Sequence, residues 1–134
     1  MEVWHRVEQT RRYARGRGAD ERHAARTAEI LRARGADAEL VLAGLLHDVA
    51  KPAETRLWHR VAGVLLEPLP VLRRRLAGGD GVLARYLDHA RRGAEEARRR
   101  GAPDRVARLI ARHHDRPRTA DERALHDADR AALP

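Results

Sequence analysis

Apolar residues recur along most of this chain at intervals of three and four, which is the spacing of one face of an α-helix. No segment shows the strict alternation of apolar and polar residues that is typical of a half-buried strand. The pattern therefore predicts an all-α fold, a compact bundle of about six to eight helices. The predicted helices cover residues 2–15, 20–34, 37–50, 53–66, 70–77, 82–100 (with a candidate break near His89), 104–115 and 120–131.

A repeated tetrapeptide marks several of the predicted helix ends. Arg-Gly-Ala-Asp occupies residues 17–20 and 34–37, and a variant with an inserted proline covers 100–104. Arginine suits the last turn of a helix, glycine the left-handed position after it, and aspartate the N-cap of the next helix. We therefore expect Asp20, Asp37 and Asp104 to cap the helices that follow them.

Two apolar runs stand out. Residues 40–46 are apolar on every side of their helix, which predicts a central, buried helix. This run leads directly into His47, Asp48 and Lys51, whose polar groups need partners there because their desolvation is costly. The second, an apolar hairpin over 57–72, is expected to complete the core, with a lid or the interface of a homodimer as alternatives.

Histidines and aspartates also fall on the apolar faces of other predicted helices. The inward-facing set has six members from five helices: His23, His47, Asp48, His89, His113 and Asp129. A lone inward histidine is usually an ordinary hydrogen-bonded core residue. Four imidazoles and two carboxylates in one core, however, are hard to satisfy by hydrogen bonds alone. Imidazole and carboxylate are ligands that suit Fe, Mn, Ni, Co and Zn, so the set predicts a divalent metal site.

Composition narrows the chemistry further. The 134 residues include 28 Lys plus Arg against 20 Asp plus Glu, a net charge of +8, and neither Cys nor Ser. The chain therefore has no disulfide, no cysteine-bound zinc and no serine nucleophile. Any covalent or hydrolytic chemistry must come from His, Asp, Glu, Thr, Tyr, Lys or an activated water. No apolar stretch approaches the roughly 20 residues that cross a bilayer, and the first residues lack an apolar signal region. We expect a cytoplasmic protein without membrane contact.

The order His23, then His47-Asp48, then Asp129 resembles the HD-domain superfamily of metal-dependent phosphohydrolases. Residues 43–51, Ala-Gly-Leu-Leu-His-Asp-Val-Ala-Lys, are similar to the central motif of that family, and the resemblance spans residues 20–131. It implies a single HD-type helical domain over 1–134, of the small single-domain type. The additional histidines, His89 and His113, are similar to those of family members with two metal ions.

The resemblance also implies roles for individual residues. His23, His47, Asp48 and Asp129 would hold a first ion. Asp48 would bridge to a second ion held by His89 and His113, with His114 as an alternative or additional ligand. Asp48 and Lys51 would be the catalytic residues, Lys51 meeting the substrate phosphate or orienting the nucleophilic water. Arginines close to the ligands in sequence are further candidates for the phosphate: Arg22 and Arg26 around His23, and Arg116 after His114.

The sequence departs from the family pattern at two positions that bear no ligand, where Ala50 replaces a glycine and Ala90 a proline. It also lacks the Gly-Tyr-Pro signature of cyclic-dinucleotide phosphodiesterases after His113, which argues against cyclic-di-GMP as a substrate. The predicted function is hydrolysis of a nucleotide or other small phosphate ester. One alternative is a regulatory module that binds metal or nucleotide without turnover. The other, favoured less because few aromatic residues accompany the dispersed arginines, is a basic nucleic-acid-binding protein.

Overall fold

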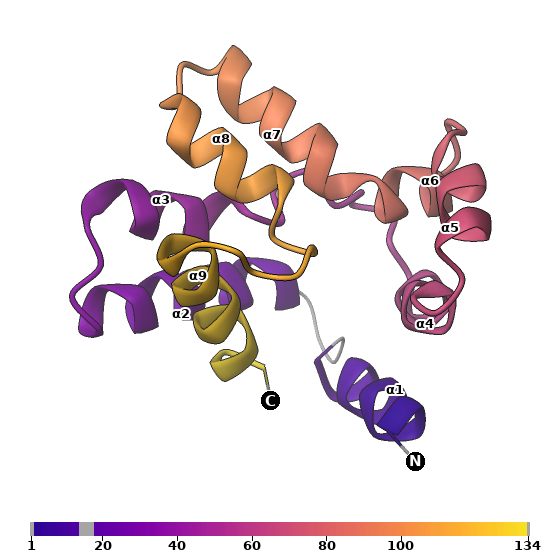
Figure 1. The fold of residues 1–134 in the computed structure, drawn as a ribbon. Helices are drawn as coiled ribbons and strands as arrows, with labels where there is room; N and C mark the ends of the chain where they lie inside the picture. The colour runs from indigo at the N-terminus through magenta and orange to yellow at the C-terminus, as the bar shows by residue number, and fades with distance from the viewer. Residues whose placement is uncertain (1, 14–17, 134) are drawn as a thin grey trace.

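The computed structural model describes residues 2–13 and 18–133 of the chain. Every regular element in these two ranges is a helix, so the all-α prediction is confirmed (Figure 1). The predicted range 82–100 divides at Asp88 into two helices. The helices are α1 (Glu2–Tyr13), α2 (Ala19–Ala33), α3 (Ala38–Leu46), α4 (Leu57–Leu66), α5 (Pro70–Ala77), α6 (Val82–Leu87), α7 (His89–Arg99), α8 (Asp104–Ala111) and α9 (Ala120–Ala131).

The hydrophobic core lies among α2, α3, α7, α8 and α9. Leu31 of α2, Ile110 of α8 and Leu125 of α9 are at most 1% exposed at its centre. Helices α2 and α3 form one packed pair, and α7 and α8 form another that crosses above it (Figure 1). Each pair reverses direction at a glycine in the left-handed region, Gly35 at φ 81° and Gly101 at φ 86°, which residues with a Cβ rarely adopt.

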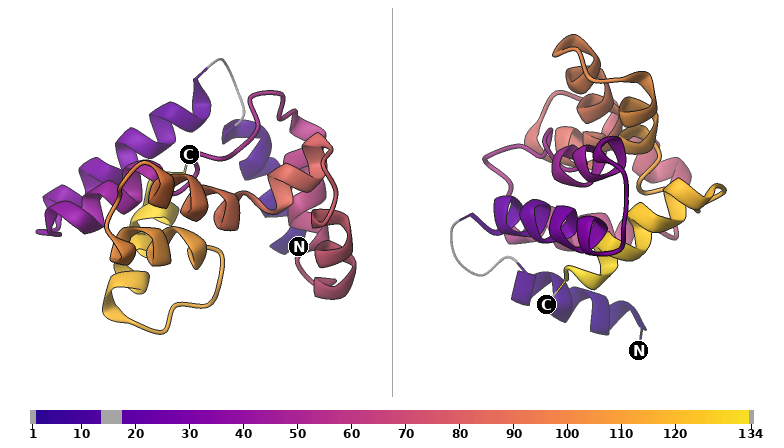
Figure 2. Two further views of the ribbon diagram at one scale, coloured as in Figure 1. Left: turned by 90° about the horizontal axis from the view of Figure 1, so that it is seen from above. Right: turned by 90° about the vertical axis from the view of Figure 1, so that its left-hand side faces the viewer.

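The other four helices form a second group beside this core, in which α4 contacts α1, α5 and α6, and α6 leads into α7 (Figures 1 and 2). The prediction that residues 57–72 complete the core is wrong. Leu65, Leu69 and Val71 are 50%, 51% and 59% exposed, and α5 has no buried residue. The reason is that the α4–α5 hairpin packs against α1 and α6 instead of the core.

Helix ends agree with the capping pattern only in part. Asp37 caps α3 as predicted, accepting a hydrogen bond from the Leu40 N–H at 2.9 Å. Asp20 and Asp104 lie inside the first turns of α2 and α8 instead, where their charge complements the helix dipole. Three predicted bounds are too generous: α3 ends at Leu46, α4 begins at Leu57 and α8 ends at Ala111, while the predicted end of the first helix at 15 falls outside the described residues.

Helix α3 is less buried than its composition suggests. Leu40, Ala43 and Gly44 face the core, but Leu45 is 46% exposed. The prediction of burial on every side therefore fails at Leu45, whereas Val41, Leu42 and Leu46 also pack against the core. Over residues 2–13 and 18–133, no helix combines the length and the apolar character that a bilayer span requires.

Candidate metal centre

The site is organised around the end of α3. A tight turn follows this helix, in which the Lys51 N–H donates to the Asp48 carbonyl at 3.0 Å. Pro52 comes next, and because proline disfavours helical conformation in the residue before it, the helix does not continue. The turn leaves His47 fully buried and Asp48 8% exposed. It also brings the Lys51 ammonium to 2.9 Å from Asp48 Oδ2.

A first group of side chains joins α2, the end of α3 and α9. Asp129 Oδ1 lies 2.5 Å from Nε2 of His23 and 3.2 Å from Nε2 of His47. These three residues offer ligand atoms that all lie within 4.8 Å of one another. The structure thus brings these three residues together, as the inward-facing set predicts.

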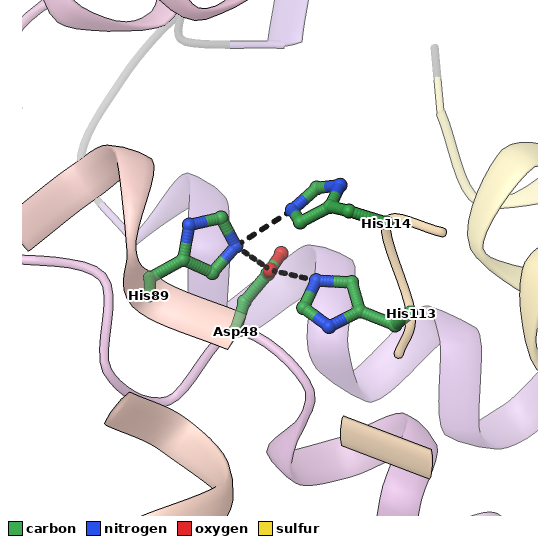
Figure 3. A group of neighbouring side chains, drawn as sticks. All are labelled: Asp48, His89, His113 and His114. Atoms are coloured by element: carbon green, nitrogen blue, oxygen red, sulfur yellow. Dashed lines mark hydrogen bonds and ion pairs between the residues drawn. The ribbon is translucent and has the colours of Figure 1, made fainter. Parts of the chain in front are cut away.

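A second group contains Asp48, His89, His113 and His114 (Figure 3). Asp48 Oδ1 lies 3.0 Å from Nε2 of His89, the first residue of α7, and 3.3 Å from Nε2 of His113, in the turn after α8. His114 Nε2 lies 2.9 Å from His89 Nε2. His89 and His113 are buried, whereas His114 is exposed at the edge of the group.

Asp48 connects the two groups. Its Oδ1 faces His89 and His113, while its Oδ2 lies 3.3 Å from Nε2 of His47, a member of the first group. The rings of His47 and His113 are accordingly neighbours, with centroids 5.1 Å apart. One carboxylate therefore has an oxygen available to each group.

The ring orientations follow one local rule. In His47, His89 and His113 the Nδ1 atom lies 2.6 Å from the carbonyl oxygen three residues earlier in the chain. Because a carbonyl only accepts, each Nδ1 must carry the proton and donate. The Nε2 atoms are thereby directed at the carboxylates, which is the tautomer and orientation that metal-binding histidines commonly show.

Charge in the first group is balanced by protonation. Burial disfavours a charged His47, but the carboxylates of Asp48 and Asp129 outweigh it and raise the His47 pKa to about 10. Burial likewise opposes ionisation of both aspartates. The charge of His47 nevertheless holds the pKa of Asp48 well below its usual range, and hydrogen bonds from His23 and His47 do the same for Asp129.

In the second group, burial lowers the pKa of His89 and favours its neutral form. With Nδ1 donating to a carbonyl, a neutral His89 turns the lone pair of Nε2 toward the Asp48 carboxylate at 3.0 Å. His113 Nε2 is also buried and makes no hydrogen bond within the described residues. Converging lone pairs of this kind fit a cation, and the donor set suits a divalent transition metal.

The structure brings together all seven residues that the sequence suggested as ligands: His23, His47, Asp48, His89, His113, His114 and Asp129. Lys51 also lies at the centre, against Asp48. Arg22, Arg26 and Arg116 are exposed at the surface. The sequence analysis gives Asp20 only a capping role and does not identify Arg60, which is buried. A charged residue inside the apolar helix α4 is the sequence feature that could have pointed to Arg60.

A family model described as HD domain matches residues 21–132, which is most of the chain. No curated protein and no solved structure matches it.

Proposed function

The chain belongs to the HD-domain family, and on that premise we propose that it is a metal-dependent phosphohydrolase that cleaves a nucleotide or another small phosphate ester with water as nucleophile. The observation that carries this proposal is the position of Asp48 between two groups of histidine and carboxylate ligands, with an oxygen facing each. The HD-domain family comprises metal-dependent phosphohydrolases, and the two groups can hold metal ions.

In this proposal His23, His47, Asp48 and Asp129 hold one divalent ion. Asp48, His89 and His113 hold a second, with His114 as a further ligand. When bound, such ions supply Lewis acidity that neutralises phosphoryl charge and acidifies water. The ion itself would be Fe, Mn, Ni, Co or Zn, since all accept this donor set.

The catalytic residues of the proposal are Asp48 and Lys51. Asp48 fixes the position of its neighbours through both oxygens, and Lys51 places one ammonium beside it at 2.9 Å. An ammonium donates up to three hydrogen bonds, so Lys51 can keep its contact with Asp48 while it binds a phosphate oxygen or orients the attacking water. The absence of Ser and Cys from the sequence agrees with a water nucleophile.

A small substrate is supported by the way the basic residues are paired. In the Arg98–Arg100 triplet, Arg98 pairs with Asp104, and Arg99 and Arg100 both pair with Glu96. Arginines that are neutralised in this way offer less to a nucleic-acid backbone. We accordingly favour a nucleotide or small ester over nucleic acid, and retain the cytoplasmic location and the homodimer as predictions.

The test is a screen of phosphomonoesters, phosphodiesters and nucleotides with the full chain loaded with Mn²⁺ or Zn²⁺. His47→Ala should lower kcat/KM by roughly a thousandfold, or about 4 kcal/mol of transition-state stabilisation. His126→Ala is the matched control, because His126 lies on α9 outside both groups and its Nδ1 lies 3.4 Å from a carboxylate oxygen of its neighbour Asp127. Hydrolysis that survives His47→Ala would contradict the proposal. A metal-loaded chain that cleaves no ester would indicate the regulatory module instead.

A further inference from the structure

Arg60 is a buried cation on α4, only 8% exposed. Its two terminal nitrogens donate to the two carboxylate oxygens of Asp20 on α2, Nη1 to Oδ1 at 3.1 Å and Nη2 to Oδ2 at 2.7 Å. A bidentate pair of this kind fixes both the distance and the orientation of the carboxylate. Arg60 therefore holds Asp20 in one place.

Asp20 in turn faces the site. Its Oδ1 lies 3.7 Å from Nζ of Lys51, and that Nζ lies 2.9 Å from Asp48 Oδ2. The ring of Tyr86 completes the surroundings of the ammonium, with its centroid 5.9 Å from Nζ. Positive and negative groups thus alternate from Arg60 through Asp20 and Lys51 to Asp48.

This arrangement explains why Lys51 sits closer to Asp48 than to Asp20. An ammonium between two free carboxylates would be drawn to both. Arg60 engages both oxygens of Asp20, which weakens the pull of that carboxylate on Lys51 and prevents it from moving closer. The ammonium is left with its shorter contact on Asp48.

Stability alone does not account for the Arg60–Asp20 pair. Burying two charges costs desolvation that their attraction often fails to recover, and apolar residues of similar volume commonly stabilise as well or better. The pair also joins separate parts of the fold, because α2 packs with α3 and α9 whereas α4 packs with α1, α5 and α6 (Figure 1). The pair therefore fixes α2 relative to α4 at a point next to Lys51.

We propose that Arg60 and Asp20 are positioning residues that hold the Lys51 ammonium against Asp48, so that it is already in place for a substrate phosphate. The inference rests on the proposed function for the role of Lys51, but the positioning itself can be measured without substrate. Lys51 is the only lysine in the sequence. Isotope labelling of lysine therefore gives a single side-chain ammonium signal in an NMR spectrum.

The experiment records that signal in the full chain with added Zn²⁺, which is diamagnetic. Wild type should show a Lys51 ammonium protected from exchange with water and two distinct Hε resonances, the signs of an immobilised side chain. Arg60→Gln and Asp20→Asn should each lose the protected signal, and the double variant should lose no more than either alone, since both residues act through one contact. Asp20→Glu, which keeps the charge but shifts the carboxylate, should retain part of it.

Arg73→Gln is the matched control, because Arg73 belongs to the same α4–α5 hairpin and donates to the Gly63 carbonyl at 2.9 Å. It should leave the Lys51 signal unchanged. A protected signal that persists in both Arg60→Gln and Asp20→Asn, or that is missing in wild type, would overturn the proposal, as would equal loss in Arg73→Gln. If Arg60→Gln does not fold, Asp20→Asn decides.

Hydrolysis measured on the same samples separates this inference from the proposed function. If the chain cleaves an ester, Arg60→Gln and Asp20→Asn should each lower kcat/KM by roughly 10- to 100-fold, the cost of a misplaced group. Wild type without any hydrolysis would reject the proposed function, while the NMR result would still decide whether Arg60 and Asp20 position Lys51.

Discussion

Asp48 Oδ1 lies 3.0 Å from Nε2 of His89, and both atoms are buried. Because the other ring nitrogen of His89 donates to the Tyr86 carbonyl, a neutral His89 has only a lone pair to offer this carboxylate oxygen. Two acceptors at this distance repel each other unless a cation or a proton lies between them. The contact therefore suits a bound cation, for which these residues supply ligand atoms.

Removing one ligand from each group should remove one ion at a time. His89→Ala takes a ligand from the group that contains Asp48, and His23→Ala takes one from the group that contains Asp129. Each should weaken Zn²⁺ binding at its own group by more than roughly 10- to 100-fold, which is the usual loss when a residue that only hydrogen-bonds to a ligand is removed. Titration calorimetry with Zn²⁺ measures this. If the titration shows one binding event and both variants weaken it, the two groups do not bind ions separately.

The tautomers of three histidines can be read directly. His47, His89 and His113 donate from Nδ1 to backbone carbonyls, so the neutral rings should be protonated at Nδ1 and bind metal through Nε2. Nitrogen chemical shifts of the zinc-loaded chain, in a long-range ¹H–¹⁵N spectrum, distinguish the two tautomers. An Nε2-protonated ring at any of these positions would be inconsistent with the site as described.

Metal binding should be pH-dependent through His47. Its pKa of about 10 means that it is protonated at neutral pH in the metal-free chain, so an ion that binds Nε2 must displace a proton. Affinity should therefore rise with pH, by up to about tenfold per unit, until the pH approaches that pKa. His47→Gln, which cannot titrate, should lose this dependence. Affinity that falls as the pH rises from 7 to about 9 would contradict the protonation of His47.

The same pKa predicts how stability changes with pH. His47 has a higher pKa folded than unfolded, so its contribution is complete below its unfolded value of 6.5 and is lost as the pH rises through about 10. The metal-free chain should accordingly lose thermal stability between these values. The metal-loaded chain should change less there, because an ion takes the place of the proton. Equal pH dependence in both forms would show that His47 is not the titrating group.

Close packing between α2 and α3 should make Gly44 sensitive to substitution. A Cβ at this position would lie 2.5 Å from Cδ1 of Leu31, whose side chain is only 1% exposed and has little room to move. Gly44→Ala should therefore lower the free energy of unfolding by about 1–3 kcal/mol. Gly79→Ala is the control, since its Cβ would make an ordinary 3.6 Å contact with Ala84. Equal stability of the two variants by chemical denaturation would contradict this packing.

The sequence predicts those parts of the structure that depend on local information. Apolar spacing is a property of each helix, so the all-α fold and most helix positions follow from it. His47 and Asp48 were identified because an apolar run leads straight into them. The break at Asp88, which sets the direction of His89, coincides with the break that the sequence predicts near His89.

Long-range contacts were less accessible from the sequence. Whether Leu45 is buried depends on which helix covers that face of α3, and spacing within α3 does not contain this information. The pairing of Arg60 with Asp20 joins residues that are 40 positions apart on separate helices. Only the three-dimensional arrangement shows that Asp20, held by Arg60, lies beside the Lys51 ammonium.

Metal content of the full chain tests the central claim most directly. After loading with Zn²⁺ and removal of unbound ions, elemental analysis should find close to two equivalents in wild type, one for each group. Asp48→Asn should retain less, because Asp48 contacts both groups, and His126→Ala should match wild type. The loading step uses a free-ion concentration far above any plausible Kd. Wild-type protein that then retains less than about a tenth of an equivalent would contradict the account.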